Sequence, residues 1–267
     1  YGGLVPAGGR APDLARLLAG GPDAAEERAW QAATIHADVL AALEGAAAEG
    51  LPRRALDVGC GTGELLRTLS AAGWDAVGTE PARALAEMGR SAGSSISQAT
   101  GSAYLRAWAS RRGEPFAGVV LLNVLEHLPD PVALLIGLHH ALLPGGRLVI
   151  RVPNDFNPLQ LAAQRALGGE PWWIAIPDHV NYFDHASIAA LVERVGFEVV
   201  QRSADFPMEL FLLMGDDYRR DPTLGAAVHR RRRRAEMALE PATRRALGEA
   251  WAATGIGRNA FIVARRP

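Results

Sequence analysis

The sequence predicts an α/β fold in which helices cover both faces of a mainly parallel sheet. Two observations predict it: short apolar runs alternate with helical patterns from residue 55 onward, and a glycine-rich turn joins the first run to the first helix. Strands that alternate with helices need crossover connections, and such connections pair strands in parallel. The length of 267 residues suffices for one such domain with a substantial core.

Residues 1–52 predict an N-terminal arm and helix ahead of the sheet. We expect a short helix near 13–18 and a longer one that begins at the N-cap Asp23, with Glu26 three positions later. Apolar residues at helical spacing mark the face that the longer helix buries, namely Trp30, Ala33, Ala37, Leu40 and Ala41. Gly50 and Pro52 end this helix.

Residues 53–267 predict the sheet domain itself. We expect strands at 55–59, 76–80, 116–122, 147–152, 197–202 and 261–264, with a weak strand near 96–98 in the ambiguous segment 91–113. Helices are expected at 64–72, at 82–88, from the cap Asp130 to Pro144, and from the cap Asp184 to Gly196. Two segments break this rhythm. We interpret them as an inserted substrate lobe, 153–183, and a helical insertion, 206–257, which together form a lid.

The composition excludes several chemistries. All 28 basic residues are arginine, which excludes Schiff-base enzymes and P-loop enzymes because both need a lysine. The one cysteine, Cys60, allows neither an intrachain disulfide nor a multi-cysteine zinc site, and it fits a cytoplasmic location. The net charge of −1 does not favour nucleic acid as a partner, and no apolar run is long enough to predict a membrane helix.

The most informative segment is the turn that carries Gly59, Gly61 and Gly63 on alternate positions. Glycine is needed where the backbone takes positive φ or lies against a ligand. Dinucleotide enzymes space these glycines as G-x-G-x-x-G, which differs from the spacing here. Glu80 ends the second expected strand, where a carboxylate can accept hydrogen bonds from two ribose hydroxyls. The alternative is a structural glycine turn with a surface glutamate.

These segments carry a resemblance to a known family. Residues 56–63 resemble motif I of the class I S-adenosylmethionine-dependent methyltransferases, and 77–81 resemble the family's second motif. Residues 123–128 resemble the segment after strand four in its small-molecule branch, and residues 144–148 resemble the family's turn before strand five. The resemblance implies a Rossmann-like sheet of seven strands, the last antiparallel, with S-adenosylmethionine at the carboxyl ends of the first strands. The cofactor-binding residues that it implies are Asp57, Gly59, Cys60, Gly61, Gly63, Glu80, Pro81, Ser102, Asn123 and Val124.

The sequence departs from the family pattern after the third strand. The family commonly has an acidic residue there that holds the adenine amino group, whereas residues 99–103 contain no acid. We expect Ser102 or a backbone carbonyl to make this contact instead.

Two histidines are candidates for the catalytic base. Methyl transfer to a hydroxyl or ammonium group also requires proton removal, and histidine suits this role. His127 follows the fourth expected strand, and His179 lies in a segment that returns to the same edge of the sheet. The alternatives are structural, with His127 bonded to a loop and His179 satisfying the backbone of a buried hairpin. No metal is expected.

Polar and aromatic residues of the first insertion are candidates for binding the methyl acceptor. Asn154 and Asp155 either meet the acceptor or form a turn beside a proline. The two tryptophans either roof the acceptor or pack the insertion onto the domain. The complete set of substrate-binding candidates is Asn154, Asp155, Trp172, Trp173, Asn181 and Tyr182.

The second insertion holds an apolar stretch and an arginine run. Residues 208–214 either close the pocket or form a homodimer contact. Because Glu236 and Glu240 follow at helical spacing, we interpret Arg230–Arg234 as a solvated helix face, with His229 solvated beside it. The alternative for the run is binding of a phosphate or of nucleic acid.

The leading functional hypothesis is methyl transfer from S-adenosylmethionine to a small molecule by in-line displacement, with oxygen favoured as the acceptor atom, then nitrogen, then carbon. Arginine-only usage suggests a GC-rich bacterial genome and so a role in natural-product or specialised metabolism. A binding subunit that has lost turnover is one alternative. A nicotinamide-dependent reductase is another, which the glycine spacing and the missing lysine disfavour.

Overall fold

A computed structural model gives the fold, and it describes residues 22–267. Seven strands form one sheet in the order β3-β2-β1-β4-β5-β7-β6. β1 to β5 pair in parallel, while β7 runs antiparallel to both of its neighbours. The seven-stranded Rossmann-like prediction is therefore confirmed. The strands are β1 Arg54–Val58, β2 Asp75–Thr79, β3 Ser95–Ser97, β4 Phe116–Leu122, β5 Leu142–Pro153, β6 Glu198–Ala204 and β7 Asn259–Arg265.

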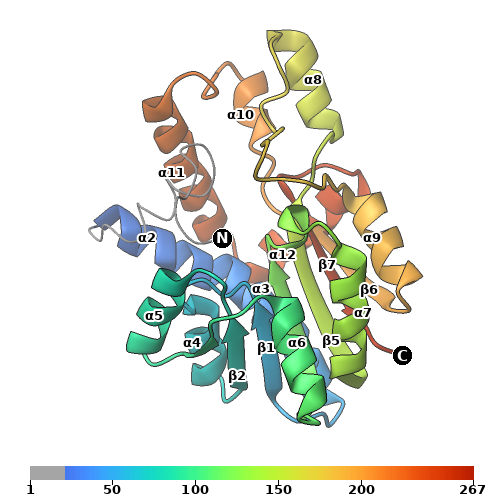
Figure 1. Cartoon of the computed structure of the whole chain (residues 1–267). Coiled ribbons are helices and arrows are strands. Elements are labelled where there is room, and N and C mark those ends of the chain that lie inside the picture. The colour runs from blue at the N-terminus through green and yellow to red at the C-terminus, as the bar shows by residue number, and fades with distance from the viewer. Residues whose placement is uncertain (1–21) are drawn as a thin grey trace.

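Helices cover both faces of this sheet (Figure 1). α6, α7 and α9 pack on one face, whereas α3 and α4 pack on the other. The helices are α2 Pro22–Gln31, α3 Ala37–Ala48, α4 Glu64–Ala71, α5 Arg83–Ser91, α6 Gly101–Ser110, α7 Pro131–Ala141, α8 Pro158–Leu167, α9 His185–Arg194, α10 Glu209–Leu213, α11 Pro222–Ala238 and α12 Pro241–Ala253, with a π turn η1 Ala32–His36 and a 3₁₀ turn η2 Leu125–His127. No described helix has the length and hydropathy that crossing a bilayer demands.

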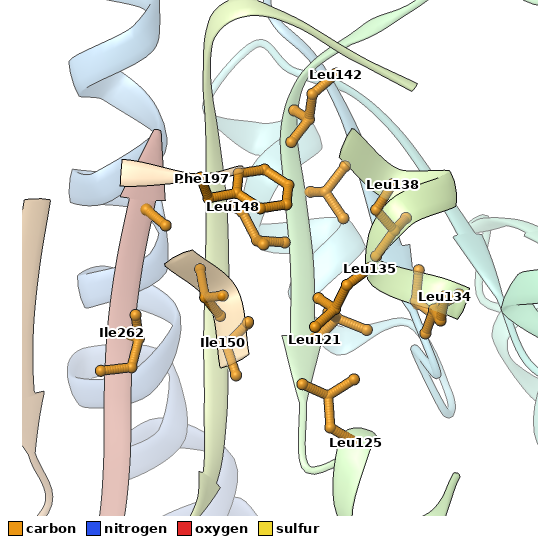
Figure 2. Close-up of a cluster of buried hydrophobic side chains, with 14 of the residues drawn as sticks. Leu121, Leu125, Leu134, Leu135, Leu138, Leu142, Leu148, Ile150, Phe197 and Ile262 are labelled. Atoms are coloured by element: carbon orange, nitrogen blue, oxygen red, sulfur yellow. The ribbon is translucent and has the colours of Figure 1, made fainter. Parts of the chain in front are cut away.

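The central strands are buried on both faces, so a hydrophobic cluster lies on each side of the sheet. Leu121 of β4 and Ile150 of β5 belong to the buried cluster on the face covered by α7, and Figure 2 shows Leu121 beside Leu135 of that helix. Their sequence neighbours point the other way, so Val120 and Val149 belong to the second cluster with α3 and α4. This two-sided burial explains why the strands read as apolar runs without polar alternation.

The buried face of the N-terminal helix differs from the predicted one. Ala33 and Ala41 are exposed, whereas Val39 and Leu43 are fully buried. The reason is the π turn η1, which adds one residue to a helical turn and rotates every later side chain relative to a regular helix. Trp30, which precedes the turn, is buried as predicted. The expected helix at 13–18 lies outside the described residues.

The segment 91–113 contains the weak strand expected near 96–98 and a helix that the sequence left open. β3 covers Ser95–Ser97, and α6 begins after Thr100, whose side chain accepts a hydrogen bond from the backbone N–H of Ala103. β5 also begins at Leu142, earlier than expected, through an irregular stretch that contains Gly145 at φ 81°.

The two expected insertions extend the carboxyl edge of the sheet. α8 lies in the first, and α10 and α11 lie in the second, all above the strand ends in Figure 1. α12 instead packs on β6, where an added Cβ at Gly248 would lie 2.4 Å from Ser203 Oγ. The α12 part of the second insertion thus covers the sheet and belongs to the domain itself. The division of the chain into arm, domain and lobes remains a prediction.

Close packing of α3 on β4 provides a test of this architecture. An added Cβ at Gly118 would lie 2.5 Å from Leu43 Cδ2, whereas one at Gly45 would lie 3.7 Å from its nearest neighbour, Arg147 Nε. We predict that Gly118→Val lowers the free energy of unfolding by about 1–3 kcal/mol through overpacking. Gly45→Ala should leave stability unchanged or raise it by about 0.5–1 kcal/mol. Urea titrations compare them, and equal stability of the two variants would contradict this packing.

Candidate active site

The glycine turn between β1 and α4 adopts the backbone geometry that its spacing predicts. Gly59, Gly61 and Gly63 have φ values of 76°, 54° and 73°, which disfavour residues with a side chain. Two of them also lack space, because an added Cβ would lie 2.8 Å from Val124 Cγ2 at Gly59 and 2.6 Å from Ser94 Oγ at Gly63. At Gly61 no atom lies within 4 Å of that position, so the backbone there borders open space.

Glu80 joins the turn to the end of β2. One carboxylate oxygen accepts a hydrogen bond from Gly61 N–H at 3.0 Å, and the other accepts one from Ala82 N–H at 2.8 Å. A carboxylate can accept about four hydrogen bonds, so both oxygens retain lone pairs for a ligand. The buried carboxylate is thereby held beside the open backbone of Gly61. This pairing matches the arrangement expected for ribose binding.

Asp57 lies on β1 beneath the turn and is buried. Burial raises the pKa of its carboxyl group, and the nearby charge of Glu80 raises it further, to about 7. Cys60 lies between the turn glycines, and its backbone N–H donates to Thr79 O at 3.0 Å. Burial raises the pKa of the Cys60 thiol, so it stays protonated. Cys60 therefore contributes backbone geometry to the turn.

Four further candidates for cofactor binding lie along the same edge. Val124 follows β4 and contacts the turn at Gly59, as the Cβ distance above shows. Asn123, at φ 55°, accepts a hydrogen bond through its side chain from Arg151 of β5. Ser102 is exposed in the first turn of α6, whose Gly101 approaches the end of β1 at Val58. The exposed Pro81 follows Glu80 directly.

His127 and His179 come together, although they lie far apart in the sequence. Their ring centroids are 4.9 Å apart with an edge-to-face geometry. His127 Nδ1 lies 2.7 Å from the carbonyl oxygen of Asp178, so in the neutral ring Nδ1 carries the proton and Nε2 has the lone pair. Nε2 lies 3.8 Å from the carboxylate of Glu126, a buried group able to stabilise an imidazolium.

This histidine pair could also hold a metal ion. Glu126, His127 and His179 each offer a ligand atom, and these atoms lie within 4.8 Å of one another. Imidazole and carboxylate are common ligands of transition metals. The geometry thus suits either proton transfer or metal binding. No sequence pattern predicts a metal site at these residues.

The substrate-binding candidates occupy structural positions. Asn154 is fully buried, and its Nδ2 donates to the carbonyl oxygens of Gly255 and Gly257 at 3.0 and 2.9 Å. Asn181 Nδ2 donates to the carbonyl oxygens of Leu125 and Leu128. Both amides therefore satisfy backbone carbonyl groups of neighbouring loops, and their part in substrate binding stays a prediction.

The aromatic candidates pack against one another. Trp173 is buried and lies edge-on to Trp172, with centroids 4.8 Å apart, and to Phe156 at 5.7 Å. Tyr182 accepts a hydrogen bond from the backbone N–H of Ala175 at 3.1 Å. These contacts hold the first insertion together below α8. Asp155, also buried, donates its N–H to Phe183 O at 2.7 Å.

A cavity of about 420 Å³ lies between α2, α11 and the end of β5. Arg151 lines it and also donates to Asn123, so the cavity adjoins the carboxyl edge of the sheet where the predicted cofactor-binding residues lie. None of the six predicted substrate residues lines it. Met208, from the apolar stretch of the second insertion, does. Sequence reasoning missed this cavity because helices from opposite ends of the chain form it.

The structure corrects the prediction that Arg230–Arg234 form a solvated helix face. Arg232 and Arg233 are only 3% and 6% exposed, so these two are not part of a solvated face, whereas Arg231 and Arg234 are exposed as predicted. Arg232 pairs with Glu236 and with Asp205, whereas Arg233 pairs with Glu27 of α2. His229 is also not solvated, since its Nε2 lies 2.8 Å from Glu27 Oε2. The run fastens α11 to α2.

Comparison with known proteins identifies the family. A family model described as a methyltransferase domain matches residues 28–202. The chain belongs to the class I S-adenosylmethionine-dependent methyltransferases. Its resemblance to that family is confirmed, and the nicotinamide-reductase alternative is wrong. The glycine turn and Glu80 fit the family's cofactor, because open backbone at Gly61 adjoins a fixed carboxylate.

Relatives and solved structures agree with this assignment. The chain is 33% identical over 103 residues to a ubiquinone biosynthesis O-methyltransferase of Xylella fastidiosa, covering 38% of this chain and 42% of the relative. A homologue of the same name from Cereibacter sphaeroides is 30% identical over 158 residues, covering 56% of this chain and 62% of the homologue. The chain thus spans less than two thirds of these curated relatives.

Solved structures share the fold at low identity. Magnesium protoporphyrin IX methyltransferase from Synechocystis, solved with bound SAH (S-adenosylhomocysteine), superposes with a TM-score of 0.56 at 14% identity, covering 97% of this chain and 96% of that one. A SAM-dependent methyltransferase from Archaeoglobus fulgidus gives 0.53 at 18% identity, covering 80% and 86%. These likenesses show the fold alone.

The open position at Gly61 generates a test of cofactor binding. We predict that Gly61→Val abolishes binding of S-adenosylhomocysteine, because the new side chain enters the cofactor space and a β-branched residue resists positive φ. Gly93→Val is the matched control, since Gly93 also has positive φ and open space but lies in the turn before β3. Calorimetric titration compares them, and equal affinities would contradict the assignment.

The buried carboxyl of Asp57 generates a pH test. The ordinary pKa of an aspartate is 3.8, whereas the pKa of Asp57 is about 7 in the folded protein, so folding favours the protonated form. The stabilising contribution is present in acid and is lost as pH rises from about 4 to 7. Asp57→Asn should therefore show a smaller loss of unfolding free energy over this range, by on the order of 2–4 kcal/mol. Asp75→Asn, at an exposed site, should follow the wild type.

Proposed function

We propose that this protein transfers a methyl group from S-adenosylmethionine to a hydroxyl group of a small molecule. The observation that carries the proposal is the position of His127, just after the predicted cofactor-binding residues Asn123 and Val124. The Asp178 carbonyl holds the proton of the neutral ring on Nδ1, so the lone pair of Nε2 is available to accept a proton. The name of the curated relatives, ubiquinone biosynthesis O-methyltransferase, supports oxygen ahead of nitrogen or carbon as the acceptor atom.

The residues of this chain would divide the work as follows. The glycine turn and Glu80 hold the cofactor, which when bound supplies a methyl group already activated by its positively charged sulfur. His127 would take the proton of the acceptor hydroxyl at Nε2 as that oxygen receives the methyl group and S-adenosylhomocysteine leaves. Glu126, 3.8 Å from Nε2, stabilises the resulting imidazolium. Alignment and exclusion of water complete the catalysis.

The setting of the reaction is a separate part of the proposal. We propose a cytoplasmic enzyme of specialised metabolism, which rests on the arginine-only composition and the single cysteine. The site needs no metal for proton transfer. A homodimer through the apolar stretch 208–214 remains a prediction.

Substitution of His127 tests the proposal. His127→Gln keeps a donor for the Asp178 carbonyl but removes the base, so we expect turnover to fall by roughly 10²–10⁴-fold with unchanged affinity for S-adenosylhomocysteine. His140→Gln, at an exposed site on α7, is the control. The assay follows release of S-adenosylhomocysteine with a panel of hydroxyl, amine and carbon acceptors. Cofactor binding without product on any acceptor would instead favour a binding subunit.

The same assay separates proton transfer from metal catalysis. Protein dialysed against EDTA should keep full activity, because an imidazole base needs no metal. Loss of activity that a divalent cation restores would contradict the base assignment and would give Glu126, His127 and His179 the role of metal ligands.

A further inference from the structure

The cavity between α2 and α11 has a charge pattern that indicates what it binds. Its wall combines apolar and aromatic side chains, among them Trp30, Ile35 and Met208, with three arginines, Arg151, Arg232 and Arg258. A volume of about 420 Å³ suits a small molecule. The question is which of these charges the protein itself neutralises.

Two of the arginines are committed to internal ion pairs. Arg151 and Arg232 both pair with Asp205, and Arg232 also pairs with Glu236 at 2.9 Å. Although burial alone would raise the pKa of Asp205, Arg151 and Arg232 hold it at about 2, so this carboxylate is always charged. These two arginines therefore build the wall and bring no unbalanced charge to it.

The acidic residue on the wall is also committed. Glu27 accepts one hydrogen bond from Arg233 at 2.7 Å and lies 2.8 Å from His229 Nε2. Burial opposes its charge, but His229 and Arg233 hold the pKa of Glu27 below its usual value. Glu27 is thus an anion that is already paired, so it does not neutralise the third arginine of the wall, Arg258.

Arg258 is different. Its backbone is fixed at the carboxyl edge, where its carbonyl accepts from Asn154 N–H at 3.0 Å, while the residue is exposed on the cavity wall. Its guanidinium forms no ion pair or side-chain hydrogen bond with the described residues. The nearby carboxyl of Asp155 is buried, and burial and Glu126 raise its pKa to about 7 although the charge of Arg258 lowers it.

Tyr218 adds a donor on the same wall. Its hydroxyl oxygen is buried and has no hydrogen-bond partner among residues 22–267. Burial raises the pKa of Tyr218 to about 12, so the group remains an O–H that can donate. A buried polar group without a partner is costly, and a ligand that accepts from it would remove that cost.

We propose that this cavity binds a methyl acceptor that carries a carboxylate, with Arg258 as its counter-ion and Tyr218 as a second donor. Arginine suits this role because its planar guanidinium matches a carboxylate with two hydrogen bonds. The apolar wall holds the carbon skeleton of the acceptor. The inference rests on the proposed function and adds the class of substrate to it.

Calorimetry with two matched pairs of probes tests the proposal. The probes are 3,4-dihydroxybenzoate and 3,4-dihydroxycinnamate, each against its carboxamide, titrated into protein with and without S-adenosylhomocysteine. We expect the wild type to bind at least one carboxylate roughly tenfold or more tightly than its amide. Arg258→Gln should abolish this preference, and Tyr218→Phe should reduce it. Arg234→Gln, which removes the same charge from an exposed position on α11, should retain it.

Three results would overturn the proposal: binding of neither carboxylate to the wild type, equal affinity for carboxylates and amides, or an equal effect of Arg258→Gln and Arg234→Gln. Titration of S-adenosylhomocysteine alone reports separately on the proposed function. If it fails to bind while the carboxylate preference persists, the methyl-transfer function is lost and the anion site stands.

Discussion

The carboxylate of Glu80 is the interaction on which the site depends. It accepts backbone hydrogen bonds from Gly61 on one side and Ala82 on the other, so it joins the turn after β1 to the turn after β2. Three glycines at positive φ let the chain reach it. Burial raises the pKa of Asp57 beneath the turn, and the nearby charge of Glu80 raises it further. The carboxyl groups of Asp57 and Glu80, which disfavour each other's charge, thus lie beside the open backbone of Gly61.

A second constraint fixes the upper part of the molecule. Trp30 of α2 donates to Glu236 of α11 at 2.9 Å, and Arg232 stacks over the Trp30 ring at 4.9 Å. Arg232 also reaches Asp205 at the end of β6, which Arg151 of β5 holds from below. Buried arginine networks of this kind need every member, because removal of one partner leaves a buried charge unpaired. The network forms the wall of the cavity and fixes Arg151 beside Asn123.

The contrast between sequence and structure follows from the range of each interaction. The glycine turn, Glu80 and the strands were predictable because local spacing and apolar runs encode them. The buried face of the first helix was not, since the π turn at 32–36 has no distinct pattern. Arg232 and Arg233 resemble solvated residues until Asp205 and Glu27 arrive from distant segments.

The candidate site shows the same limit. His127 and His179 were each predictable as residues of the carboxyl edge, but only the fold shows their rings 4.9 Å apart. Asn154 and Asn181 match the pattern of ligand-binding residues, yet their amides bond to backbone carbonyls of neighbouring loops. Arg258 is exposed and belongs to no sequence motif. It becomes a candidate for ligand binding only when the structure shows that the other charged residues of the cavity wall are already paired.

The most direct measurement of the central claim is calorimetric titration of S-adenosylhomocysteine into the wild type and Glu80→Ala, with Glu87→Ala as an exposed control on α5. If Glu80 both shapes the turn and meets the ligand, its loss should weaken binding by about 1–3 kcal/mol while Glu87→Ala binds as the wild type does. Unchanged affinity in Glu80→Ala, or no binding by the wild type, would contradict the account.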